Sequence, residues 1–158
     1  MRRRFPILIC LAIILMAQEA SADLTAFLGV NQSPSTRRVR GVALSISLLF
    51  VGFEFEYSDT VEDTSTDAPS LRSGMFNIQL QTPSTGGLQF YGTAGGGLYQ
   101  ERLTDHRETN IATNAGGGIK LAIVGPIGIR IDYRIFKLNG NPVHTNPQRV
   151  YVGFNLPF

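Results

Sequence analysis

The residues best suited to nucleophilic chemistry are two histidines and the hydroxyl side chains near them in the sequence. His106 follows Asp105, and His144 lies in a second polar stretch near the end of the chain. A hydrolytic site needs a nucleophile held against a histidine base, and the spacing of the serines to these histidines matches no lipase motif. We therefore expect both histidines to be solvated loop residues and the protein not to be an enzyme.

Two other groups of residues have the composition of a ligand site but not its spacing. Residues 59–67 contain four acidic side chains, without the fixed ligand order and the glycine turn of a calcium loop. The glycine triplets at 95–97 and 116–118 are followed by no strand-to-helix junction that could hold a phosphate group. We expect no metal site and no cofactor, and we interpret the triplets as strand glycines that relieve crowding.

The elements that must position these residues are strands, because after residue 22 the apolar residues recur with a period of two. Turn-rich breaks separate eight alternating segments, at residues 24–30, 41–48, 51–58, 76–81, 88–100, 111–124, 127–135 and 149–158. The breaks after the second, fourth and sixth segments are short. Those after the odd segments are long and polar: 31–40, 59–72, 101–110 and 139–148. Short turns on one rim and long loops on the other are typical of outer-membrane barrels.

The first 22 residues have the pattern of a cleaved export signal. Arg2, Arg3 and Arg4 precede an apolar run at 5–17, and the small residues 20–22 supply a cleavage site before Asp23. A membrane anchor is the alternative, but a spanning helix needs roughly 20 apolar residues. We therefore expect a signal peptide at 1–22 and one domain at 23–158.

The charge of the mature chain argues against nucleic acid as a partner. The signal contains three arginines and Glu19, so its removal reduces 14 basic and 12 acidic residues to 11 of each. A neutral chain has no surplus of cations to neutralise phosphates.

Alternation alone does not decide which face of the barrel points inward. A soluble periplasmic ligand-binding barrel would bury the apolar face, whereas a transmembrane barrel turns it toward lipid. The polar face contains many small residues, which a narrow lumen needs and a soluble surface does not: Ser45, Ser47, Gly116, Gly118, Gly128 and Gly153. Together with the loop asymmetry, this pattern favours the transmembrane barrel.

The last strand provides the most specific resemblance. It holds Tyr151 and Phe154 and ends at Phe158, which resembles the terminal-phenylalanine assembly signal of bacterial outer-membrane barrels. The mature chain is similar to the small eight-stranded outer-membrane proteins, such as the OmpA transmembrane domain and the opacity-type proteins. The resemblance implies an all-β, antiparallel, up-and-down barrel in the bacterial outer membrane, inserted by the barrel assembly machinery. It also implies contact with outer-membrane lipid and with lipopolysaccharide, whose divalent ions the acidic loop could touch. We expect a monomer.

In such a barrel the third and seventh strands lie on opposite sides of the lumen. We expect the carboxylates of Glu54 and Glu56 to face the guanidinium groups of Arg130 and Arg134, with Asp132 and Lys120 joining this network. The interior of an eight-stranded barrel is filled by side chains, so these ion pairs would plug the lumen in a purely structural role. The sequence thus predicts a barrel with a structural or surface-interaction role. A narrow channel or a transporter of small hydrophobic molecules is the alternative.

Overall fold

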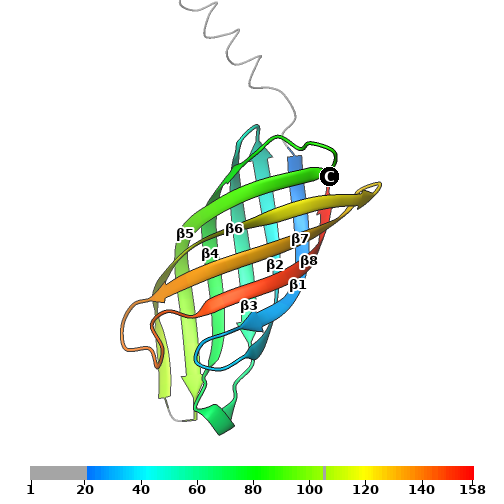
Figure 1. Ribbon diagram of the computed structural model, residues 1–158. Coiled ribbons are helices and arrows are strands. Elements are labelled where there is room, and N and C mark those ends of the chain that lie inside the picture. Colours follow the sequence, from blue (N-terminus) through cyan, green and yellow to red (C-terminus); the bar gives the residue numbers. More distant parts are fainter. Residues whose placement is uncertain (1–20, 105) are drawn as a thin grey trace, which may run out of the picture.

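The computed structural model describes residues 21–104 and 106–158, which form one closed antiparallel β-barrel (Figure 1). Each strand pairs with its neighbour in sequence, and β8 pairs with β1 to close the sheet. The strands are β1 (Ser21–Asn31), β2 (Arg37–Leu48), β3 (Val51–Thr60), β4 (Ser70–Gln81), β5 (Leu88–Leu103), β6 (His106–Val124), β7 (Ile127–Leu138) and β8 (Gln148–Pro157). The predicted fold class and strand count are therefore confirmed.

The two rims of the barrel differ less than the sequence predicted. The connections after β2, β4 and β6 and the C-terminus lie at the top of Figure 1, and the other connections lie at the bottom. The two longest connections, 61–69 and 139–147, belong to the lower rim, but only two residues separate β5 from β6 there. The connection between β3 and β4 contains a single turn of 3-10 helix, η1 (Thr64–Thr66). No helix among the described residues is long and apolar enough to cross a membrane.

One of the expected long loops is mostly strand and another is half strand, which corrects their predicted bounds. β5 continues to Leu103 and β6 starts at His106, so most of 101–110 is a paired hairpin, and β2 already begins at Arg37. The apolar pattern ends where the side chains leave the membrane, whereas backbone pairing continues because each extended pair still satisfies its N–H and C=O groups.

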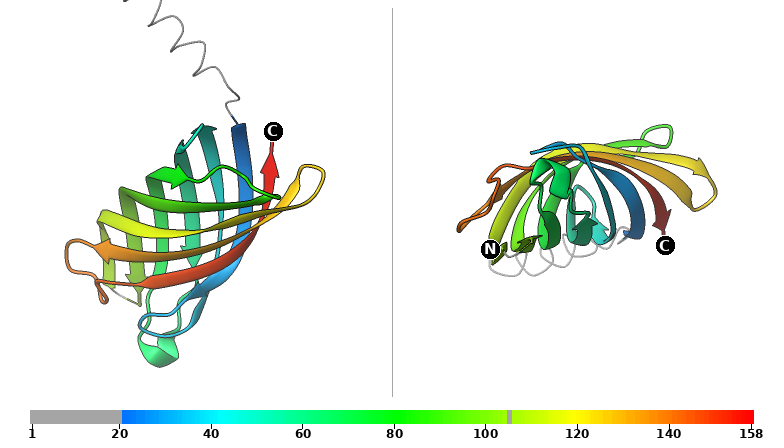
Figure 2. Two further views of the ribbon diagram at one scale, coloured as in Figure 1. Left: turned by 45° about the horizontal axis from the view of Figure 1, so that its top comes forward. Right: turned by 90° about the horizontal axis from the view of Figure 1, so that it is seen from below.

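The polarity of the barrel is that of a membrane protein. Alternate residues point outward and are apolar, such as Phe55 at 58% exposure, while the residues between them are buried in the lumen, such as Glu54 at 0%. All eight strands curve around this interior (Figure 2). This orientation is the reverse of the soluble ligand-binding barrel and supports the transmembrane alternative.

The lumen contains two clusters of buried apolar residues, one including Met75, Tyr99 and Phe136 and the other including Phe27 and Tyr151. Charged side chains lie against these clusters, since the guanidinium group of Arg149 lies over the rings of Phe27, Phe136 and Tyr151. A cavity opens at the short-turn rim.

The predicted export signal falls almost entirely on residues 1–20, outside the described residues. Ser21 and Ala22, its last two residues, begin β1, and cleavage before Asp23 stays a prediction.

Candidate functional site in the barrel lumen

Glu54, on β3, is the most highly coordinated charged group of the lumen. Arg130 Nη1 donates a hydrogen bond to Glu54 Oε2 at 2.5 Å, and Arg134 Nη2 donates to Oε1 at 2.7 Å. Three neutral side chains also donate to the same carboxylate: Asn77, Gln79 and Ser45. A buried carboxylate loses the free energy of its hydration. Hydrogen bonds from five side chains, two of them cations, compensate much of that loss for Glu54.

The two arginines lie four residues apart on β7, so the pleat of the strand turns both into the lumen. Asp132 lies between them and pairs with each, at 3.2 Å from Arg130 Nη2 and 2.9 Å from Arg134 Nε. Arg134 also reaches Glu56 on β3 at 3.0 Å. The ion pairs thus join one side of the barrel to the other.

A third arginine, Arg149 on β8, completes the set. It pairs with Glu56 at 2.6 Å and donates to Ser58 Oγ at 2.9 Å. Six side chains, each at most 1% exposed, make up what we term the lumen ionic network: Glu54, Glu56, Asp132, Arg130, Arg134 and Arg149. Three carboxylates and three guanidinium groups leave it formally neutral, which is the condition for burying charge at tolerable cost.

Tyr91, on β5, ties the network to a further strand. Its hydroxyl donates to Asp132 and accepts a bond of 2.7 Å from Arg130 Nε. The guanidinium of Arg130 also lies over the Tyr91 ring, 4.6 Å from its centroid. The tyrosine therefore binds both an anion and a cation of the network, which restricts the rotamers of both.

Lys120 lies apart from the network, contrary to the sequence prediction. Its ammonium group pairs with Asp23 on β1 at 2.7 Å. Lys120 is the register partner of Arg130 on the neighbouring strand, and two adjacent cations repel one another, so Lys120 extends toward a different carboxylate. The other five predicted residues are brought together.

Sequence reasoning missed Arg149, Tyr91 and Asp23 as members of the lumen pairs. A sequence signal for Arg149 was present, because it occupies the polar face of its strand; the structure makes it the register partner of Arg134. The pairing of Asp23 with Lys120 joins residues 97 positions apart, and no local pattern indicates it.

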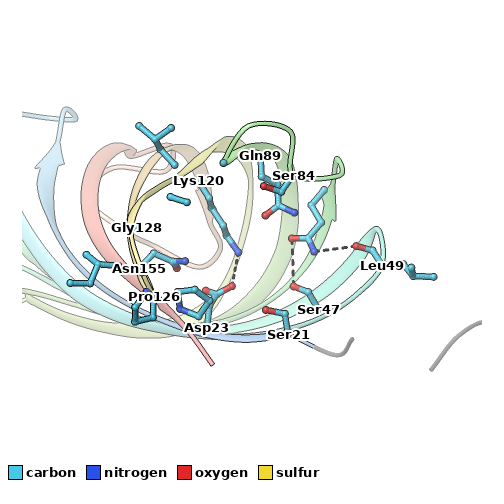
Figure 3. Close-up of a pocket in the computed structure, with 17 residues that line it drawn as sticks. Ser21, Asp23, Ser47, Leu49, Ser84, Gln89, Lys120, Pro126, Gly128 and Asn155 are labelled. Atoms are coloured by element: carbon cyan, nitrogen blue, oxygen red, sulfur yellow. Dashed lines mark hydrogen bonds and ion pairs between the residues drawn. The ribbon is translucent and has the colours of Figure 1, made fainter. Parts of the chain in front are cut away.

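A cavity of 810 Å³ opens at the short-turn rim (Figure 3). The Asp23–Lys120 pair projects into it, together with Ser47, Gln89 and Asn155. Its lining includes none of the six network residues. The lumen is therefore open from this rim as far as the Asp23–Lys120 pair, and the network lies beyond.

The three residues predicted to form a C-terminal assembly signal lie on two different faces. Phe154 and Phe158 point outward, at 67% and 75% exposure. Tyr151 is buried in the lumen, where its ring stacks on Phe27 with centroids 4.0 Å apart. The outward aromatic surface thus excludes Tyr151, and a role in assembly stays a prediction for all three residues.

The histidines are placed differently from one another. His144 lies in the connection between β7 and β8, as predicted, but His106 begins β6 and pairs in register with Leu103. The loop assignment of His106 was therefore wrong, because the hairpin is longer than its polarity suggests. Among the described side chains, no group of three or more histidine, cysteine or acidic residues is placed to hold a metal ion.

Comparison with known proteins adds evidence on the fold. No protein-family model matches the chain, and no curated protein matches its sequence. The N-terminal β-barrel domain of Pseudomonas aeruginosa OprF superposes with a TM-score of 0.67 at 16% identity, over 89% of this chain and 98% of that one. The fold is that of the eight-stranded transmembrane β-barrels.

Two further structures with this fold are an attachment invasion locus protein and an enzyme. Ail, the attachment invasion locus protein of Yersinia pestis, was solved with the heparin analogue sucrose octasulfate. It superposes with a TM-score of 0.61 at 11% identity, over 89% of this chain and all of that one. The outer-membrane enzyme PagL gives 0.56 at 12% identity, over 86% and 99%. The barrel fold therefore accommodates both attachment proteins and enzymes.

Proposed function

We propose that this protein is a non-enzymatic barrel of the bacterial outer membrane, with a structural or surface-interaction role and a closed lumen. The observation that carries the proposal is the inverted polarity, with apolar side chains outside and paired charges inside. Such a surface is stable only against hydrocarbon. The likeness of the fold to OprF and Ail supports the outer membrane as that environment.

The proposal that the lumen is closed depends on the lumen ionic network. An ion or solute crossing the barrel would have to separate pairs such as Arg130–Glu54 and Arg134–Glu56, which span the interior. Separating a buried pair leaves an uncompensated charge, at a cost of about 3–5 kcal/mol. Several such pairs would have to part together, so the network favours a plug over a narrow channel or a transporter.

The fold alone does not exclude an enzyme, since PagL is an enzyme with this fold. We therefore propose the absence of catalysis from the residues of this chain. Hydrolysis requires a histidine held by a nucleophile and by an orienting group. Among the described residues, no hydrogen bond or ion pair joins the side chain of His144 to a serine, threonine or carboxylate. A surface role is supported instead by the two long connections, after β3 and β7, that lie on the same rim, as in Figure 1.

Two measurements test this function. The folded chain should be extracted from membranes only with detergent and should migrate differently on gels before and after boiling, as closed barrels do. Pure protein in planar bilayers should show no stable, ion-selective openings. Free solubility in buffer would contradict the membrane location, and sustained conductance would contradict the closed lumen.

A further inference from the structure

The charged residues on the outside of the barrel are confined to one end. Outward positions of the described strands carry six basic side chains, all toward the long connections: Arg38, Arg40, Arg72, Arg102, Arg107 and Lys137. We term these six residues the basic belt. Asp59 is the only acidic residue at an outward strand position in the described chain, and the half of the barrel toward the short turns has no charged outward residue there.

The basic belt lies at the edge of the apolar surface. From Arg40 to Leu48 the outward residues of β2 are Val42, Leu44, Ile46 and Leu48. These eight steps along a tilted strand cover roughly 20 Å, against an apolar band of roughly 25 Å in membrane barrels. Arg40 therefore lies where the hydrocarbon meets the headgroups.

Two concavities on the outer surface meet at Arg72. One has a volume of 610 Å³ and is lined by the apolar side chains of Leu28, Tyr57 and Phe154. Its charged lining residues are Arg40, Arg72 and Asp59, and Asp59 pairs with both arginines. The small side chain of Ala26, which pairs in register with Val42 and Phe154, contributes to its lining. We term this concavity the outer groove.

The second concavity, of 350 Å³, gathers three guanidinium groups from three strands: Arg72 of β4, Arg102 of β5 and Arg107 of β6. We term it the arginine pocket. Glu62 also lines it. Arg72 pairs with Asp59 at 3.0 Å, but the described structure contains no ion pair between a carboxylate and either Arg102 or Arg107. Guanidinium groups bind phosphate oxygens through paired hydrogen bonds, so this pocket has the donors for a phosphate group.

We propose that the outer groove and the arginine pocket together bind a phosphorylated lipid of the outer leaflet, with a phosphate at the arginines and an acyl chain in the groove. In an outer membrane this lipid is lipopolysaccharide, whose lipid A carries both groups. The proposal rests on the membrane location proposed above. An apolar groove continuous with the lipid-facing surface favours a lipid over a soluble polyanion.

The test compares two double variants that remove the same charge. Arg72→Gln with Arg107→Gln alters the arginine pocket, and Arg38→Gln with Lys137→Gln alters belt residues outside both concavities. Full-length barrel folded in detergent would be titrated with bis-phosphorylated lipid A, dephosphorylated lipid A, phosphatidylglycerol and sucrose octasulfate. Heat-modifiable migration reports the fold of each variant.

We expect the wild type to bind bis-phosphorylated lipid A in preference to the other three probes. The pocket variant should bind it at least tenfold more weakly, and the control variant should stay within threefold of wild type. Equal losses in both variants would show diffuse attraction and overturn the proposal. Equal binding of phosphatidylglycerol would overturn the choice of lipid, and preferred binding of the octasulfate would identify a soluble polyanion instead. A folded barrel that inserts into bilayers but ignores lipid A contradicts this inference alone, whereas a chain that does not insert also contradicts the proposed function.

Discussion

At the scale of single residues, Glu54 decides whether the lumen charges can be buried. Its two oxygens accept bonds from two guanidinium groups and from three neutral donors on neighbouring strands. No other described carboxylate accepts hydrogen bonds from so many side chains. If its charge is lost, Arg130 keeps only Asp132 and Tyr91 as polar partners.

We predict that Glu54→Gln destabilises the folded barrel by about 3 kcal/mol, because it leaves guanidinium charge uncompensated in the lumen. Equilibrium urea unfolding in lipid vesicles measures the change. Glu62→Gln is the matched control, since Glu62 lies in an exposed connection, and it should alter the free energy of unfolding by less than about 0.5 kcal/mol. Equal stability of the two variants would show that the network contributes little.

The Tyr91 hydroxyl allows a finer test of the same network. Tyr91→Phe keeps the ring but leaves Asp132 and Arg130 each without one partner, so we expect a loss of about 1–3 kcal/mol in unfolding free energy. Tyr133→Phe provides the comparison, because that hydroxyl bonds to Gln148 on the exposed outer surface. The prediction fails if both substitutions have the same effect in the unfolding assay.

At the scale of elements, the inward glycines of β5 and β6 have no room for a side chain, whereas the outward ones do. The exception is Gly117, where an added Cβ would lie 2.7 Å from the carbonyl oxygen of Tyr91. A methyl group at the inward Gly116 would overlap the carbonyl oxygen of Tyr133 and lie 2.9 Å from the Cα of Arg134. One at the outward Gly92 would meet nothing closer than 4.0 Å. The strong curvature of this pair of strands thus leaves no room for inward side chains at such positions.

Gly116→Ala should therefore destabilise the barrel by about 1–3 kcal/mol through overpacking. Gly92→Ala should be neutral or slightly stabilising, because alanine loses less backbone entropy than glycine. Thermal unfolding followed by heat-modifiable gel migration distinguishes the two variants. A lower midpoint for Gly92→Ala than for Gly116→Ala would contradict the assigned faces.

At the scale of the whole molecule, closure of the sheet determines how the barrel can associate. The pairing of β8 with β1 leaves neither edge of the sheet free along the barrel wall, so strand addition by a second copy is blocked there. We predict one polypeptide per detergent micelle in density-matched sedimentation. A stable dimer at micromolar concentration would show that the outer surface, and not a strand edge, mediates association.

The sequence by itself determined the number of strands and which side chains share a face. The reason is that the pleat of a strand has a period of two, so Glu54 and Phe55 must lie on opposite faces. Only the tertiary structure decided the strand ends beyond the apolar band and the partners within the lumen. Lys120 pairs with Asp23, and Arg149 joins Glu56, because the radial distances across a closed barrel depend on strand tilt and register, which no local pattern contains.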